Sequence, residues 1–281
     1  MGAYEHEGLR VDVDRGVAFV TLDHPPVNLF DAVLIGSLGD LAGELADDAE
    51  VGAVVVRSAD PEFFIAHADL GLIQALPRDR TDRPERLEFI HVFMERWRRL
   101  PQVTIAQLEG RARGGGSEFA LSLDLRFGAI GRAILGQPEV AVGILPGGSG
   151  TQRLPRLMGR GRALGAVLGC DDFDAELAER YGWINRALPP AEIGSFVDRL
   201  ARRIAAFPRL AVRLAKQAVD AAGGALEDGL LEESHCFNLT LADPALDARM
   251  EGALAAGAQT RAGELDLPGL IEASLRPGSA P

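Results

Sequence analysis

Cysteine is scarce in this chain, and its scarcity excludes two common structural devices. Only Cys170 and Cys236 are present, so the sequence has neither the density of a disulfide scaffold nor the paired spacing of a zinc site. We therefore expect a protein that works in a reducing interior and uses no metal. The two cysteines are expected to lie in the core or in helices.

Long apolar runs are also missing from the sequence. No stretch approaches the length that a membrane-spanning helix needs. Residues 1–10 lack the basic segment followed by an apolar stretch that marks a secretory leader. Together these absences predict a cytoplasmic protein that has no membrane partner.

Positive charge is in deficit, and Lys216 is the only lysine. The chain carries 29 Lys and Arg residues against 41 Asp and Glu residues, which gives a formal net charge of -12. Nucleic acids and anionic membranes both require a cationic protein surface, so neither is expected as a partner. Any anionic ligand must therefore be held by a local group of donors.

What the sequence does contain is a regular succession of strand and helix patterns. Residues 11–13 and 17–22 read as two strands joined by a tight turn at Asp14-Arg15-Gly16. Residues 31–46 carry leucines at helical spacing, and residues 51–56 form a β-branched run apolar enough to be buried on both faces. These patterns predict alternating strands and helices.

The same cycle repeats further along the chain. A helical pattern from Leu87 to Leu100 stops at Pro101, a strand is predicted over 103–108, and three glycines then open a helix that runs to Leu123. This order indicates an α/β core with its ligand site on the turns that follow the strands. From residue 174 onward helices are expected to dominate and to end near residue 258.

The most informative motif is Gly114-Gly115-Gly116, followed two positions later by Glu118. Glycines after a buried strand leave main-chain N–H groups uncovered at the positive end of a helix, where a developing negative charge is stabilised. A tight turn that allows close packing of strand and helix is the alternative. The carboxylate on the first helical turn favours the functional interpretation.

Two further loops share this character. The segment 63–70 is a small-residue loop after a strand, in which Asp69 is placed to cap the next helix at Leu70. Glu139 follows Pro138 and precedes the glycine-rich segment 143–154. Each loop combines a close approach to the main chain with a nearby carboxylate.

These three elements stand in the order and approximate spacing found in enzymes of the crotonase superfamily. Supporting matches are Pro26-Val27-Asn28, the segment 178–185, and Pro208 followed eight positions later by Lys216. The chain resembles the enoyl-CoA hydratase/isomerase family over nearly its whole length. The combined pattern is far more specific than any one of its parts.

The resemblance implies an α/β fold of the crotonase type, a spiral of ββα turns over residues 1–207. Residues 208–281 would form a C-terminal helical region that serves oligomerisation. The assembly would be a homotrimer or a dimer of trimers, and the substrate an acyl-CoA thioester. Coenzyme A is part of that substrate, so no separate cofactor is expected.

The resemblance also assigns roles to particular residues. Glu118 would help to activate water, Glu139 would handle the proton at Cα, and the N–H groups of Ala68 and Gly115 would form the oxyanion hole. Ala66 and Leu70 would lie along coenzyme A, where the family uses main-chain contacts. The remaining candidates would contact the substrate or its coenzyme A part: His67, Asp69 and Gly114.

Two acidic side chains at these positions favour hydration of a 2-enoyl-CoA, since other members of the superfamily often keep only one. An enoyl-CoA Δ3-Δ2 isomerase or another acyl-CoA enzyme of the same fold is the alternative. A non-catalytic acyl-CoA-binding protein is the rival from a different class, and the presence of both Glu118 and Glu139 argues against it.

Several residues depart from the family pattern. His67 stands where glycine is usual, and two interpretations remain open: its imidazole contacts the acyl-CoA or a neighbouring loop, or it faces solvent. A positive φ there would strain a histidine. The bulky Phe30 and Phe119 are expected in the core. The cluster of Arg96, Arg98 and Arg99 is interpreted as a charged helix face rather than a site for the phosphates of coenzyme A.

Overall fold

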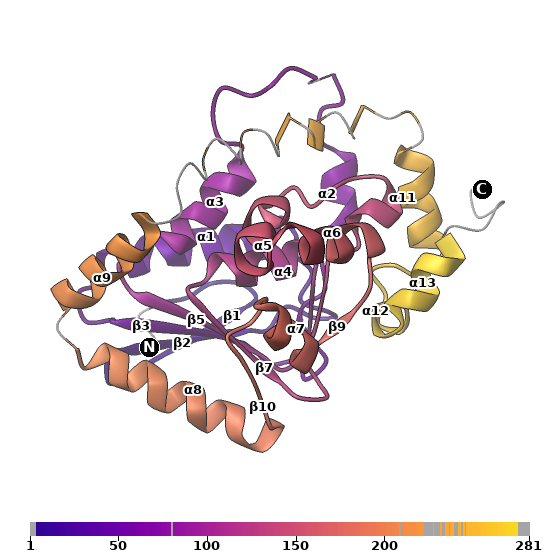
Figure 1. Ribbon diagram of the computed structural model, residues 1–281. Coiled ribbons are helices and arrows are strands. Elements are labelled where there is room, and N and C mark those ends of the chain that lie inside the picture. The colour runs from indigo at the N-terminus through magenta and orange to yellow at the C-terminus, as the bar shows by residue number, and fades with distance from the viewer. Residues whose placement is uncertain are drawn as a thin grey trace.

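The computed structural model describes most of the chain (Figure 1). The described residues are 4–79, 81–207, 209–221, 227, 231, 234–235, 237–238, 241–242, 244 and 246–274. Pro208 and Cys236 lie outside them, so the expectations placed on these two residues are not tested.

The larger of two sheets begins with the predicted hairpin. Strands β1 (Leu9–Asp14) and β2 (Val17–Leu22) pair antiparallel. Arg15 and Gly16 both have positive φ, 50° and 73°, which is the backbone of the tight turn that matches the twist of a hairpin. The two-strand prediction is therefore confirmed.

The rest of this sheet is parallel and follows the order β1-β2-β3-β5-β7-β10. It adds β3 (Ala53–Ser58), β5 (Val103–Leu108), β7 (Leu125–Ala129) and β10 (Arg186–Leu188). The first four residues of β3 are fully buried, because α8 (Pro190–Ala205) packs on one face and the main core on the other (Figure 1). Burial on both faces explains the uninterrupted β-branched run.

A second, smaller sheet runs in the order β4-β6-β8-β9. It consists of β4 (Phe63–Ile65), β6 (Arg111–Arg113), β8 (Ile134–Gly136) and β9 (Phe173–Asp174). Each long strand β3, β5 and β7 is followed by a short strand of this second sheet and then by a helical segment. This repetition is the expected ββα spiral.

Helices fill the spaces between the strands. They are α1 (Ala32–Asp47), α2 (Leu70–Gln74), α3 (Phe89–Arg98), α4 (Gly115–Ser122), the 3₁₀ turn η1 (Glu139–Val142), α5 (Gly150–Met158), α6 (Arg160–Gly169) and α7 (Ala175–Tyr181). Asp31 caps α1 by accepting from the Leu34 N–H at 2.9 Å. The helix predicted over 31–46 is confirmed, and its periodic leucines are buried: Leu34, Leu38, Leu41 and Leu45.

The C-terminal part contains α9 (Arg209–Ala221), α11 (Leu246–Ala255), α12 (Arg261–Leu265) and α13 (Leu267–Ser274). The expectation that helices end near residue 258 is wrong. Thr260 caps a further short helix, and Leu267 and Leu270 are buried against Leu70. The segment continues because it covers apolar surface, which its short and glycine-containing sequence does not reveal.

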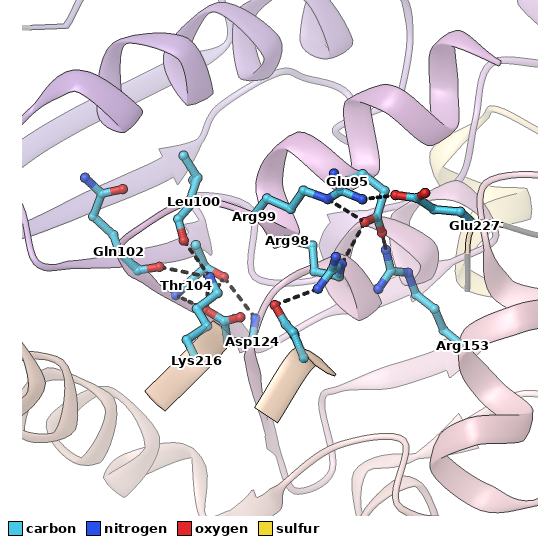
Figure 2. Close-up of polar contacts among 11 residues, drawn as sticks. Glu95, Arg98, Arg99, Leu100, Gln102, Thr104, Asp124, Arg153, Lys216 and Glu227 are labelled. Carbon is cyan, nitrogen blue, oxygen red and sulfur yellow. Dashed lines mark hydrogen bonds and ion pairs between the residues drawn. The ribbon is translucent and has the colours of Figure 1, made fainter. Parts of the chain in front are cut away.

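Lys216 fastens α9 to the core (Figure 2). Its ammonium group donates to the carbonyl oxygens of Leu100 and Gln102 at 2.8 and 3.1 Å, and to Asp124 at 2.8 Å. The only lysine of the chain is thus a structural anchor beside the starts of β5 and β7. The domain boundary at residue 208 stays a prediction.

Candidate active site

Three loops lie side by side because the strands that precede them are neighbours. Strands β4, β6 and β8 are parallel, so their carboxyl ends meet at one edge of the small sheet. The loop after β4 contains His67 and Ala68, the loop after β6 contains Gly114, and β8 is followed by Glu139. The motifs singled out from the sequence are therefore neighbours in space.

A cavity of about 450 Å³ opens between these loops. It is lined mainly by apolar side chains, and eight of the nine candidate residues face it: His67, Ala68, Asp69, Leu70, Gly114, Gly115, Glu118 and Glu139. Volumes of this size are typical of small-molecule and cofactor sites.

No helix in the described part of the chain is long and apolar enough to span a membrane.

Ala66 is the candidate that does not line the cavity. Its side chain is buried with Val27 and Phe63, and its N–H donates to the Val27 carbonyl at 3.2 Å. Any contribution of Ala66 to coenzyme A binding would have to come from its main chain, and that role stays a prediction.

Ala68 and Gly115 are close neighbours that both line the cavity. A Cβ atom built on Gly115 would lie 3.2 Å from the Ala68 Cβ and 3.4 Å from the Ala68 nitrogen. Neither residue's N–H has an acceptor among the residues that the structure describes. The Gly115 N–H belongs to the first turn of α4, where helical N–H groups have no partner within the helix.

Glu118 is held by the glycine-rich loop that begins α5. Its Oε1 accepts from the N–H groups of Gly148 and Gly150 at 2.9 and 2.7 Å, and only 3% of the residue is exposed. Hydrogen bonds from main-chain N–H groups to a carboxylate are charge-assisted and directional. The carboxylate therefore has a fixed orientation although it is nearly buried.

Glu139 is held by a different neighbour. The side-chain NH₂ of Gln137, oriented to face the carboxylate, donates to both of its oxygens at 3.1 Å. Gln137 is fully buried, and 9% of Glu139 is exposed. Gln137 was not singled out from the sequence, since a glutamine beside a turn carries no signal of its own.

Comparison with known proteins decides the family. The enoyl-CoA hydratase/isomerase family model matches residues 12–247. The chain belongs to the enoyl-CoA hydratase/isomerase family. A Mycobacterium bovis protein named as a probable enoyl-CoA hydratase is 32% identical over 242 residues, which cover 84% of this chain and 91% of that protein.

Two more members of the enoyl-CoA hydratase/isomerase family illustrate the likeness. A short-chain-enoyl-CoA hydratase of Clostridium acetobutylicum is 34% identical, over 73% of this chain and 77% of its own length. A crystal structure of a Streptomyces avermitilis protein assigned to the enoyl-CoA hydratases superposes with a TM-score of 0.89 and 44% identity. That superposition covers 97% of this chain and all of the other, so the fold is that of the crotonase-type enzymes.

His67, the departure from the family pattern, is held at both ring nitrogens. Nδ1 lies 2.8 Å from the Ala68 carbonyl oxygen, and Nε2 lies 2.5 Å from Glu264 Oε1 on α12. Only 12% of the side chain is exposed, so the solvent-facing interpretation is wrong. His67 has no positive φ and hence none of the strain considered from the sequence.

Other expectations for this family member are met nearby. The Asp69 carboxylate accepts from the Gly71 N–H at 2.6 Å and caps α2. Phe119 is fully buried in the core, whereas Phe30 is buried there and also lines the cavity. The second role of Phe30 was not predicted.

Two arginines of the cluster at the end of α3 pair with acidic groups. Arg98 and Arg99 both donate to Glu95 Oε2, at 2.8 and 3.2 Å (Figure 2). Arg98 also lies 2.7 Å from Asp220. The interpretation as a charged helix face is confirmed for Arg98 and Arg99, and Glu95 is the partner that the sequence did not reveal.

Proposed function

We propose that this chain is an enoyl-CoA hydratase that adds water across the 2,3 double bond of a 2-enoyl-CoA thioester. One observation carries the proposal: Glu118 and Glu139 line the same cavity as Ala68 and Gly115, whose N–H groups have no acceptor among the described residues. Hydration of an activated double bond needs both a pair of proton-transfer groups and donors for a developing oxyanion.

The thioester carbonyl oxygen is proposed to accept from the N–H groups of Ala68 and Gly115. Polarising this carbonyl makes Cβ electrophilic and stabilises the enolate that forms when water attacks. The Gly115 donor is reinforced by the positive end of α4. One such donor is worth about 3 kcal/mol in the transition state.

Water is then added by the two carboxyl groups. In the proposed step, Glu118 accepts a proton from water while the water oxygen bonds to Cβ, and a protonated Glu139 delivers its proton to Cα. The C=C π bond is lost, one C–O and one C–H bond are formed, and proton exchange with solvent restores the two carboxyl groups. Each proton-transfer group contributes a factor of about 10² to 10⁴.

The acyl part of the substrate is proposed to be apolar and longer than a crotonyl group. Apart from its few polar groups, the cavity is walled by aliphatic and aromatic side chains, among them Leu72, Ile73, Leu76, Ile90 and Met94. A four-carbon acyl group would leave much of the roughly 450 Å³ unfilled. Coenzyme A enters only as part of this substrate.

The experiment is a panel of 2-enoyl-CoA thioesters of increasing chain length, assayed by loss of enoyl absorbance. We expect hydration by the wild-type chain, with kcat/KM rising beyond four carbons. Glu118→Gln and Glu139→Gln should each lower kcat by about 10² to 10⁴, because each removes one proton-transfer group without changing its volume.

The same panel tests the alternatives. Conversion of 3-enoyl thioesters without net hydration would replace the hydratase by an isomerase. Thioester binding without turnover would make the chain an acyl-CoA-binding protein. A Glu118→Gln or Glu139→Gln variant with wild-type kcat would remove that residue from the mechanism.

We also propose that the C-terminal region 208–281 mediates assembly into a homotrimer or a dimer of trimers. Leu210 and Leu214 lie one turn apart on α9 and are 58% and 49% exposed. Exposed large aliphatic side chains on one helix face are typical of an interface. A second copy of the chain is the proposed partner for this face.

A further inference from the structure

The loop that carries Ala68 is joined to the C-terminal helices by a buried pair of side chains. His67 Nε2 lies 2.5 Å from Glu264 Oε1, across 197 positions of sequence. The Glu264 side chain is fully buried, and 12% of the His67 side chain is exposed. A pair of ionisable groups at this depth is costly unless each charge is compensated, so the contact calls for an explanation.

The hydrogen bonds fit a charged pair, with an ionised Glu264 and a protonated His67. The Ala68 carbonyl oxygen is only an acceptor, so His67 Nδ1 must donate to it. An ionised Glu264 is likewise only an acceptor, so Nε2 must donate as well. An imidazole that donates from both nitrogens is an imidazolium cation.

Glu264 is itself fixed from two sides. The side-chain Oε1 of Glu264 also accepts from the Gln259 N–H at 2.7 Å. The main-chain carbonyl oxygen of Glu264 accepts from Arg113 Nη1 at 2.6 Å. Arg113, on β6, is paired with Asp172 at 2.8 and 2.5 Å. The acceptor for His67 is thus part of a rigid network between β6 and α12.

The charged groups around the pair support an ion pair at neutral pH. Burial lowers the pKa of His67, but the hydrogen bond and charge of Glu264 outweigh it, and the pKa is raised overall. Burial raises the pKa of Glu264, but His67 outweighs it, and that pKa is lowered overall. Arg113, Asp69 and Glu139 also lie nearby, and the charge of Arg113 opposes that of His67.

The peptide units on both sides of Ala68 are held by three hydrogen bonds. The Phe30 N–H donates to the His67 carbonyl at 2.9 Å, and the Asp69 N–H donates to the Phe30 carbonyl at 3.2 Å. The third is the bond from His67 Nδ1 to the Ala68 carbonyl at 2.8 Å. These bonds determine the direction in which the Ala68 N–H points.

We propose that His67, oriented by Glu264, is a positioning residue that fixes the Ala68 N–H for the thioester oxygen. This inference rests on the proposed function. Both ring nitrogens of His67 are occupied, so its side chain does not donate to the substrate itself. A neutral imidazole carries one N–H, and loss of the proton therefore breaks either the bond to Ala68 or the bond to Glu264.

The pair also holds the wall of the cavity in place. Ala258, Leu267 and Leu270 come from the segment around α12 and α13, line the cavity and pack with Leu70, which follows the Ala68 loop. Gln259 Nε2 adds a second link by donating to Asp69 at 3.1 Å. One set of contacts thus connects the C-terminal helices to the predicted oxyanion donor.

The test compares His67→Gly, which installs the usual residue of the family, with Glu264→Gln, which keeps an acceptor but removes the charge. His6→Gln is the matched control, since His6 and Glu44 form a similar pair at 3.0 Å away from the cavity. Kinetics on the best 2-enoyl-CoA are measured from pH 6 to 10, and each variant's melting temperature is recorded.

We expect His67→Gly to lower kcat about tenfold, with KM changed by less than about threefold. In the wild type, kcat should fall on the alkaline side as His67 loses its proton. This alkaline fall in kcat, the alkaline limb of the pH profile, should be absent in His67→Gly. In Glu264→Gln the limb should move to lower pH, because the charge that raises the pKa of His67 is gone. His6→Gln should keep both the wild-type kcat and the limb.

A lower melting temperature with unchanged kcat and an unchanged alkaline limb would mean that the pair is only structural, and would overturn the proposal. A wild-type chain that hydrates no thioester would instead overturn the proposed function. Histidine NMR titration separates the cases further. A His67 resonance that titrates at or below the ordinary pKa of 6.5 would refute the ion pair regardless of activity.

Discussion

The smallest residues around the cavity determine where the two carboxylates lie. A Cβ atom on Gly114 would come within 2.9 Å of Glu139 Oε1, and Gly114 has a φ of 48° that a larger residue rarely adopts. A Cβ atom on Gly148 would come within 2.6 Å of Glu118 Oε2. A side chain at either position would collide with a carboxylate, so both glycines are needed for space as well as for the turn.

Gly148→Ala should therefore reduce both activity and stability. The methyl group meets the buried Glu118 carboxylate, which must give up hydrogen bonds from the main chain and leave its proposed productive orientation. We expect kcat to fall by about 10-fold or more, toward the range seen when an acid/base group is lost. Steady-state kinetics and thermal melting of the same preparation provide the check.

Gly43→Ala is the matched control, because a Cβ atom there meets nothing within 4 Å. It lies inside α1 and should stabilise the chain by about 0.5 to 1 kcal/mol with unchanged kcat. Equal losses of activity in both glycine variants would contradict the role given to Gly148.

At the scale of elements, a buried network holds α5 against α3 (Figure 2). Arg153 on α5 donates to Glu95 on α3 at 2.6 Å and to the Ser149 hydroxyl at 2.7 Å. Ser149 stands between Gly148 and Gly150, whose N–H groups hold Glu118. The position of one carboxylate in the cavity thus depends on an ion pair outside it.

Glu95→Gln should lower both stability and kcat. Removing the charge of Glu95 leaves the buried Arg153 without its opposite charge, which lowers the free energy of unfolding by about 3 kcal/mol. Burial raises the pKa of Glu95, but the opposite effect of Arg153 and Arg98 is larger, so the pKa is lowered overall. The stabilisation by Glu95 is thus present above about pH 4.5 and lost as pH falls through the folded-state pKa.

Urea unfolding at several pH values measures this difference. The difference in the free energy of unfolding between wild type and Glu95→Gln should be largest near neutral pH and should vanish in acid. Glu44→Gln serves as the control, because Glu44 is about half exposed and its pair with His6 should contribute at most about 1 kcal/mol. A difference independent of pH would contradict the role of the Glu95 charge.

At the scale of the whole molecule, α9 presents leucines that no described part of the chain covers fully. If α9 contributes to the proposed assembly, Leu214→Glu should dissociate it, because burying a carboxylate in an apolar contact costs several kcal/mol. Light scattering coupled to gel filtration gives the mass. Val13→Glu, on the edge strand β1 where Val13 is 46% exposed, should leave the mass unchanged.

A monomeric wild-type chain would remove the oligomerisation proposal. An intact assembly in Leu214→Glu would move the interface away from α9, whereas dissociation by Val13→Glu would place it on the large sheet. These outcomes are independent of the proposed acid/base chemistry, since Leu214 does not line the cavity.

The sequence by itself determined several of the local elements and the family. Periodic leucines predicted α1, a β-branched run predicted β3, and the triple glycine predicted the start of α4. These signals survive without a structure because they arise from neighbours within a few residues, through helix periodicity, burial on both strand faces and capping.

Only the tertiary structure decided which distant groups meet. The pairs His67–Glu264 and Glu95–Arg153 and the bond from Gln137 to Glu139 leave no periodicity or motif. The strands β4 and β6 to β10 and the last helices were missed for the same reason, since burial against remote residues stabilises them. The expectation of a loop over 63–70 is wrong for residues 63–65, which form β4. Contacts formed by the closing of a spiral depend on the packing of the entire chain, and no local pattern encodes them.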